Sequence, residues 1–400
     1  IKYALKEQSE IKTGTSILGR MWEDLDNLTE RRWALITVIA ALIITIVCSI
    51  VMQNLRIGDL DSGAPELRPE SRYNQDNAYF TSHYGLSSDQ FVIIVKTNEE
   101  GCRLYGALLK MDALAQALRQ DPAVQTTISL AETTRYITSA MFEGSAKWLA
   151  LNRDQAILNA AVSAGIISSP DITNPQCSVS PLVTYLTDHK ADTLTRILAI
   201  SEQFAGENNT LDGEHPIEFL LAAGSAGIEA ATNIEVQKSI FTMYLAVYGA
   251  TAILCLITFR SIRATVIALI PLIMTTIICK ALMVWLGIGL KVATLPVIAV
   301  GVGVGVDYAL YLLSVQIAVQ RRGQSLQNAY RQSLNFTGKV VALVGVTMAA
   351  GVVTWVWSPI KFQADMGILL TFMFLWNMLG ALILIPALSH FFLNKVKSAV

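Results

Sequence analysis

The sequence predicts a multi-pass α-helical membrane protein with six transmembrane helices and a large α+β domain inserted after the first. Hydrophobic residues make up 53% of the 400 residues and charged residues only 15%, a composition unlike that of soluble globular proteins. Six apolar runs approach the length of roughly 20 residues that spans a bilayer. A single polar stretch of domain size separates the first run from the other five.

The first span is predicted over residues 33–52. Residues 1–32 before it are polar and place Ile17, Met21, Leu25 and Leu28 three or four positions apart. This spacing fits an amphipathic helix on the membrane surface and fits an ordinary linker helix equally well. After the polar stretch, residues 238–400 are predicted to form a five-helix bundle with spans at 240–259, 264–286, 292–315, 340–357 and 366–392.

Residues 53–237 have the patterning of a folded domain. Strands are expected at 90–96, 124–130, 181–187 and 217–222, and helices at 104–120, 133–164 and 191–204. Because strand, helix and strand alternate twice, we expect a ferredoxin-like domain built from split βαβ units. Cys102 and Cys177 are the two cysteines of this stretch, and an oxidising compartment would allow them to form a disulfide.

The distribution of charge predicts the orientation in the membrane. Lys and Arg gather at one set of span ends, namely Arg31, Arg32, Arg260, Arg263, Arg321, Arg322, Arg331, Lys339, Lys395 and Lys397. The positive-inside rule places these ends and both termini in the cytoplasm, and the large domain outside. That domain carries 23 acids against 12 Lys and Arg, a net charge of −11, which argues against nucleic-acid binding.

One ionisable residue stands out in the fourth predicted span. Asp307 follows glycines 301, 303 and 305 in an otherwise apolar segment. A carboxylate at that depth costs at least about 2.5–3.5 kcal/mol and usually marks an ion or proton path. We therefore expect Asp307 to be a proton relay buried between helices, with Tyr308 or Tyr311 beside it and Thr347 within reach. The alternative is a carboxyl group that only joins helices through a hydrogen bond. Gly301, Gly303 and Gly305 would let a neighbouring helix approach closely.

The sequence gives little support for nucleotide binding, metal binding or enzyme activity. The Gly-Val repeat lacks the strand, turn and following Lys-Ser/Thr of a phosphate-binding loop, and the four histidines have no metal-ligand spacing. No nucleophile motif is present, so we expect neither an enzyme nor a cofactor, with protons as the coupling ion. Lys280 is expected to extend to the membrane interface or to form an ion pair. Asp365 is expected to be a solvated or capping residue.

Several stretches together resemble a known family. A glycine-rich fourth span with Gly-Val-Asp-Tyr at 305–308, in a six-span layout with a domain after the first span, is similar to one half of a resistance-nodulation-division (RND) transporter. The closer resemblance is to the hydrophobe/amphiphile branch that includes the mycobacterial-membrane-protein-large (MMPL) exporters. Residues 58–76, 185–194, 289–312 and 362–388 resemble the same branch. The chain starts with Ile1 and looks like the C-terminal half of a two-half protein.

The resemblance implies a function. In this family, proton influx drives hydrophobic or amphiphilic substrates, lipids among them, through a periplasmic porter domain, and an Asp-Tyr pair in each half is the proton relay. Here the pair would be Asp307 and Tyr308, with the second relay in an N-terminal half. A bacterial inner-membrane location follows, and a homo-oligomer and periplasmic or outer-membrane partners are compatible with it. The alternatives are a sterol- or lipid-sensing module and a secretion accessory like SecD/SecF.

Overall fold

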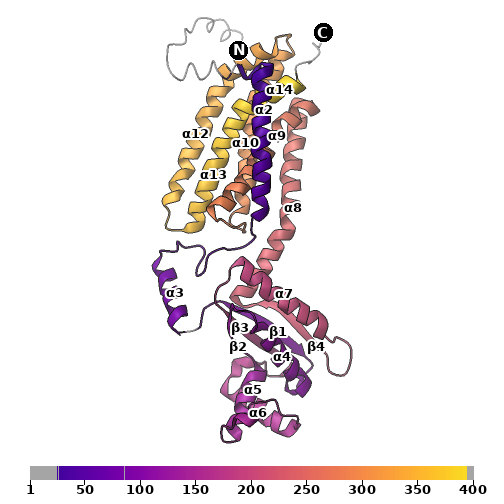
Figure 1. Ribbon diagram of the computed structural model, residues 1–400. Coiled ribbons are helices and arrows are strands. Elements are labelled where there is room, and N and C mark those ends of the chain that lie inside the picture. Colours follow the sequence, from indigo (N-terminus) through magenta and orange to yellow (C-terminus); the bar gives the residue numbers. More distant parts are fainter. Residues whose placement is uncertain (1–24, 26, 85, 394–400) are drawn as a thin grey trace. The chain divides into compact units, whose positions relative to one another are not determined.

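The computed structural model describes residue 25 and residues 27–84 and 86–393. The chain divides into two compact units, which we describe separately (Figure 1). The membrane unit comprises residues 1–55, 239–358 and 362–400, and the polar unit comprises residues 56–238 and 359–361. The amphipathic helix predicted over 1–32 lies almost entirely outside the described residues.

Six helices in the described part of the chain are long and apolar enough to cross a membrane, so the prediction of a multi-pass helical membrane protein is confirmed. Three of them are single helices, α2 (Arg31–Val51), α9 (Ile262–Leu286) and α10 (Leu295–Gln320). A fourth, α8 (Gly224–Phe259), starts directly after the last strand, well before the predicted start at residue 240. Because no proline interrupts residues 224–259, the helix can run without a break. It begins in the polar unit and ends in the membrane unit.

The last two spans each contain a π-helical turn. The fifth joins α11 (Leu326–Ser333) to α12 (Lys339–Val353) through residues Leu334–Gly338 and ends in a 3₁₀ turn at Thr354–Trp357. The sixth joins α13 (Lys361–Leu379) to α14 (Ile385–Phe392) through residues Gly380–Leu384. Such turns loosen the regular hydrogen-bond ladder and occur often at functional sites.

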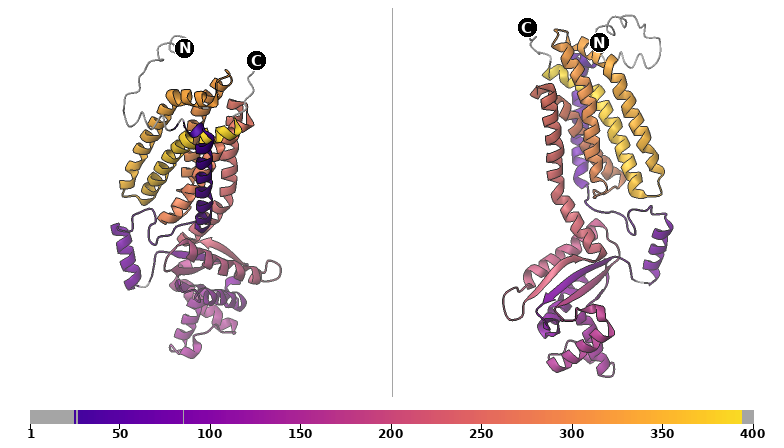
Figure 2. Two further views of the ribbon diagram at one scale, coloured as in Figure 1. Left: turned by 45° about the horizontal axis from the view of Figure 1, so that its top comes forward. Right: turned by 180° about the vertical axis from the view of Figure 1, so that it is seen from behind.

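Helix α10 contributes to both apolar cores of the membrane unit. Its buried side chains Val302, Leu312 and Leu313 pack in the larger core with residues of α9 and α14, and Val297 belongs to a smaller core with residues of α9, α12 and α13. By contrast, α2 buries only Ala34. Figure 2 shows the spans side by side from two further directions.

The polar unit contains one four-stranded antiparallel sheet. Its strands are β1 (Gln90–Thr97), β2 (Val124–Ile128), β3 (Val179–Leu186) and β4 (Ile217–Ala223), in the order β2-β3-β1-β4. Central strand β1 pairs with β3 from Gln90 opposite Tyr185 to Lys96 opposite Val179. Alternate β1 side chains, Phe91, Ile93 and Val95, are buried in the core, as the period of two in a strand requires. All four predicted strands are present.

Helices α4 (Tyr105–Leu118) and α7 (Ala191–Asn208) join β1 to β2 and β3 to β4, and both contribute to the same core as the strands. The region predicted as helical over 133–164 consists of two packed helices, α5 (Leu130–Met141) and α6 (Gln155–Ser168). The chain turns between them because Glu143 and Gly144 both have positive φ, and Asp154 caps α6. Helix α3 (Arg72–Tyr84) was not predicted.

Short 3₁₀ turns complete the described chain at Asn27–Thr29, Met52–Asn54, Gly101–Arg103, Ala146–Trp148 and Pro170–Ile172.

Candidate functional site

Asp307 lies at the midpoint of α10, in the span where the sequence places it. Its side chain is exposed on the surface of the membrane unit, so the expectation that other helices of this chain bury it is wrong. Gly303, Tyr311 and Ser314 lie on the same face and are also exposed. Their spacing of three or four residues makes one continuous stripe along the helix. We call this the Asp307 stripe.

The neighbours expected around Asp307 are found in different places. Tyr308 points away from the stripe into the apolar core and is 1% exposed. Tyr311 is on the stripe, one turn from Asp307, and is 54% exposed. Thr347 of α12 is exposed as well, and its hydroxyl donates to carbonyl groups of its own helix, those of Leu343 and Val344. Of the predicted relay residues, Tyr311 alone therefore shares the face of Asp307.

The glycines of α10 have different roles. A Cβ on Gly305 would lie 2.6 Å from the Asn377 amide nitrogen, and one on Gly301 would collide with Met373. Asn377 also donates a 2.8 Å hydrogen bond to the Gly301 carbonyl. These two glycines therefore allow α13 to pack closely on α10, as small residues do in membranes. A Cβ on Gly303 would meet no described atom within 4 Å, because this glycine lies on the exposed stripe.

Two further polar residues of the spans were singled out in the sequence. The Lys280 ammonium of α9 lies 4.3 Å from the centre of the Tyr244 ring of α8, a cation–π contact that the sequence did not indicate. Asp365, expected to be solvated or to cap a helix, lies near the start of α13 and is 8% exposed. The structure therefore excludes the solvated alternative for Asp365.

In the polar unit, the structure joins Cys102 to Cys177 in a disulfide with a Cα–Cα distance of 5.4 Å. Both residues are buried in the core of the unit. The bond ties the turn after β1 to the loop before β3, which are 75 residues apart in sequence.

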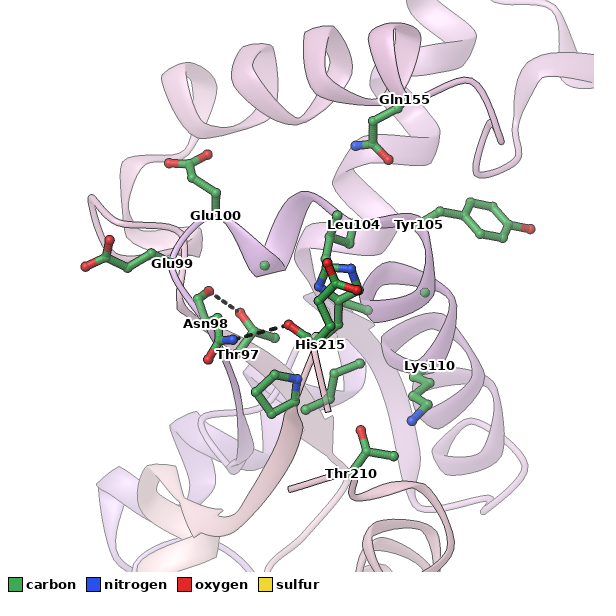
Figure 3. Close-up of a pocket in the computed structure, with 16 residues that line it drawn as sticks. Thr97, Asn98, Glu99, Glu100, Leu104, Tyr105, Lys110, Gln155, Thr210 and His215 are labelled. Carbon is green, nitrogen blue, oxygen red and sulfur yellow. Dashed lines mark hydrogen bonds between the residues drawn. The ribbon is translucent and has the colours of Figure 1, made fainter. Parts of the chain in front are cut away.

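A pocket of about 670 Å³ opens at the end of β1 and the start of α4 (Figure 3). Its apolar wall contains Leu104, Pro216 and Ile217, and its polar side chains include Glu99, Glu100, Lys110, Gln155, Glu214 and His215. Among the lining residues, the Asn98 amide donates a 3.5 Å hydrogen bond to the Glu214 carbonyl. The volume falls within the range of small-molecule sites in proteins.

A buried acid–histidine cluster in the polar unit was not predicted from the sequence. His189 is 5% exposed; its Nδ1 donates to Asp89 at 2.9 Å, and its Nε2 lies 4.0 Å from a Glu229 carboxylate oxygen. Burial by itself would lower the pKa of this imidazole, but the hydrogen bond with Asp89 and the negative charges of Glu229 and Asp59 raise it from 6.5 to about 9. We call these four residues the His189 cluster.

The His189 cluster joins four segments that are distant in sequence. Asp59 follows the first span, Asp89 precedes β1, His189 precedes α7 and Glu229 lies near the start of α8. The Asp59 carbonyl also accepts a 2.8 Å hydrogen bond from the Ala191 amide. The Thr-Asp-His-Lys sequence at 187–190 indicates only a polar segment, and nothing in it indicates that the carboxyl groups of Asp59, Asp89 and Glu229 lie nearby in the folded protein. Within the described residues, no group of His, Cys, Asp and Glu has the arrangement of a metal site.

Comparison with known protein families assigns residues 78–395 to the MMPL family. This match covers both units, including the sheet, α10 and the Asp307 stripe. The chain belongs to the MMPL family. Members of this family are RND-type transporters rather than enzymes, so the resemblance found in the sequence is confirmed.

A comparison with individual proteins gives a match over a shorter part of the chain than the family match does. Over 152 residues, or 38% of the chain, the MMPL protein described here is 27% identical to a protein of Methanocaldococcus jannaschii whose name describes it as a membrane protein. The chain spans about two fifths of the length of this curated relative, since the match covers 39% of it.

Proposed function

We propose that this MMPL protein takes part in proton-motive-force-driven export of hydrophobic or amphiphilic molecules, lipids among them. The observation that supports this most directly is Asp307, a carboxyl group at the midpoint of a helix that spans the membrane. Keeping an acid there costs several kcal/mol unless it is neutralised or covered. A group that must gain a proton to lose its charge is suited to couple proton entry to a change in packing.

The exposure of the Asp307 stripe supports a partner within the membrane. Gly303, Asp307, Tyr311 and Ser314 would face lipid if the chain were alone, and a carboxylate is least tolerated there. We infer that an N-terminal half with a second relay covers this stripe, so that Asp307 becomes buried in the complete protein. A second copy of this chain would cover the same face in a homo-oligomer.

Helix α8 provides a mechanical connection for the proposed cycle. It runs without a break from Gly224, directly after β4, to Phe259 at the far end of the second span. Protonation of Asp307 would remove its charge and change how α10 packs with its neighbours. A tilt of α8 would then be transmitted to the sheet through β4. Each proton contributes about 2.3 kcal/mol at 100 mV, which is enough to shift a two-state equilibrium about fiftyfold.

We interpret the strand order β2-β3-β1-β4 as a ferredoxin-like, porter-type domain on the periplasmic side of a bacterial inner membrane. The arginines at the ends of α8 to α10 support this orientation, since Arg260, Arg263 and Arg321 lie at one end of these spans. The pocket at the start of α4 supports an exporter over a secretion accessory, because it combines an apolar wall with polar groups, as an amphiphile requires. A sterol- or lipid-sensing module would have a similar pocket without proton flux.

The test replaces Asp307 with Asn in the full natural protein, reconstituted in liposomes with an imposed pH gradient. We expect lipid export and proton flux both to be lost, because the amide cannot take up and release a proton. Ser314→Ala, on the same exposed stripe, is the matched control and should retain both. Intact transport in Asp307→Asn would exclude the proposed coupling, and lipid binding without any proton flux in the unaltered protein would favour the sensor.

A further inference from the structure

The segment that follows the first span lies against the first turns of α8 within the polar unit. Glu229 and Asn233 are one turn apart on α8 and share a face. Gly58 is buried and packs on Asn233, since a Cβ on this glycine would lie 2.5 Å from the Asn233 amide nitrogen. The next residue, Asp59, has its carboxyl group within hydrogen-bond reach of the Glu229 carboxyl group. Two successive residues of the segment therefore contact two successive turns of the helix.

Other contacts place both partners without involving a titratable group. The Asp59 carbonyl accepts a 2.8 Å hydrogen bond from the Ala191 amide at the start of α7. On α8, Ala226 and Ala230 are buried in the core of the polar unit. The chain enters the polar unit through the segment after the first span and leaves it through α8. The Asp59–Glu229 contact therefore joins the entry of the chain to its exit.

The surroundings of Glu229 disfavour its ionised form. Its side chain is 24% exposed, and among the residues that the structure describes no group donates to its Oε1 atom. The titratable groups that face it are the carboxyl groups of Asp59 and Asp89 and the imidazole of His189. The two carboxylates repel a third negative charge, whereas the imidazolium attracts it. A hydrogen bond between two carboxyl groups also requires that one of them holds a proton.

The direction of the resulting pH dependence follows from these neighbours. Burial raises the pKa of Glu229 from 4.5 to about 7, the His189 charge opposes the rise, and the charge of Asp59 and the hydrogen bond with it add to the rise. Because the folded pKa is the higher one, proton binding stabilises the contact fully below about pH 4.5, and this stabilisation is lost as the pH rises through 7. Each pKa unit is a factor of ten, so the equilibrium between closed and open contact shifts by at most about three hundredfold.

We propose that Asp59 and Glu229 form a proton-binding site that fastens the segment after the first span to the start of α8 and releases it when the proton leaves. With the proton bound, the neutral Glu229 carboxyl group donates to the Asp59 carboxylate. Once the proton has passed to solvent, two neighbouring carboxylates repel each other and the contact opens. The ligand is a proton from the compartment that the polar unit faces. Only the assignment of that compartment to the periplasm rests on the proposed function.

The first experiment follows the contact by hydrogen–deuterium exchange of the full natural protein in lipid nanodiscs, with rates corrected for the intrinsic effect of pH. The Ala191 amide is the reporter, because it donates to the Asp59 carbonyl. Its protection should fall by about tenfold or more between about pH 6 and 8. Glu229→Gln keeps a neutral donor and should stay protected over this range. Glu202→Gln, at an exposed position of α7, is the matched control and should behave like the unaltered protein.

Two results of this experiment would overturn the proposal. One is protection of the Ala191 amide that does not change with pH in the unaltered protein, a measurement that needs no variant. The other is protection in Glu229→Gln that falls with pH as steeply as in the unaltered protein, since the loss would then come from another group.

The second experiment measures the proton on Glu229 by infrared difference spectroscopy against Glu229→Gln. The protonated carboxyl band should disappear with a midpoint near pH 7. Asp59→Asn should lower this midpoint by about one pH unit, because it removes a negative charge, and His189→Gln should raise it, because it removes a positive one. A purely structural contact would not shift the midpoint in opposite directions. A band already lost at about pH 5, or one midpoint in all three proteins, would refute the proton site.

This proposal and the proposed function fail separately. Asp307 is not among the groups that face Glu229, so Asp307→Asn should leave the midpoint of the Glu229 band unchanged. Intact transport in Asp307→Asn would refute the proposed coupling and leave the proton site standing. A midpoint of the Glu229 band that moves in Asp307→Asn as far as in Asp59→Asn would overturn the assignment of the proton to the Asp59–Glu229 contact.

Discussion

The His189 cluster makes the stability of the polar unit dependent on pH in a predictable direction. We consider the substitution His189→Gln, which keeps a side chain able to donate to Asp89 but carries no charge and does not titrate. The unaltered imidazole is 5% exposed and accepts a proton in a site that contains the carboxyl groups of Asp59, Asp89 and Glu229. The folded state therefore binds this proton more tightly than the unfolded chain does.

The magnitude follows from the difference between the two pKa values. The pKa of His189 is about 9 in the folded protein against 6.5 ordinarily, and one pKa unit corresponds to about 1.4 kcal/mol. Proton binding by His189 thus contributes up to about 3 kcal/mol to the free energy of unfolding, whereas burial raises the pKa of Glu229 to about 7 and opposes part of this contribution at neutral pH. Because the folded pKa is the higher one, the contribution is complete below about pH 6.5 and is lost as the pH rises through 9.

The assay is urea unfolding of the full chain in nanodiscs, read by pulse proteolysis of polar-unit peptides at a series of pH values. At about pH 6 the variant should be less stable than the unaltered protein, and the two should converge towards pH 10. Thr195→Val, an exchange on α7 outside the cluster, is a control for the helix. Parallel pH curves for the unaltered protein and His189→Gln would refute the reasoning, as would an NMR titration that finds the His189 pKa near 6.5.

Two further predictions concern packing and covalent structure. Gly305→Ala should destabilise the membrane unit by about 1–3 kcal/mol, because the added methyl collides with Asn377. Gly303→Ala is the control and should leave the thermal midpoint of the isolated chain unchanged. Equal thermal midpoints for the two variants would contradict this prediction. Replacing Cys102 and Cys177 together with Ser should lower the stability of the polar unit by about 4 kcal/mol at most, because the bond closes a loop of 75 residues. Reductant should cause the same loss of stability in the unaltered protein and have no effect on the double variant. Equal pulse-proteolysis midpoints for the unaltered protein and the double variant would argue against a stabilising bond.

The membrane character and the order of elements could be predicted from the sequence because they depend on local pattern. Apolar runs of sufficient length specify spans whatever surrounds them, and alternating or helical periodicity specified the four strands and the helices that join them. The position of Asp307 at the middle of a span was also a matter of sequence alone, since counting residues along α10 is enough. Its exposed side was not, because burial depends on which neighbours pack against the helix.

The sites that only the tertiary structure revealed are made of residues far apart in the chain. His189 acquires its raised pKa from Asp89, Glu229 and Asp59, which are 100, 40 and 130 residues away in the sequence, and no local pattern indicates contacts over such separations. Sequence determined which groups the spans and strands carry. The packing of helices and strands decided which of those groups come into contact, because the interacting side chains lie far apart in the sequence and only the folded chain brings them together.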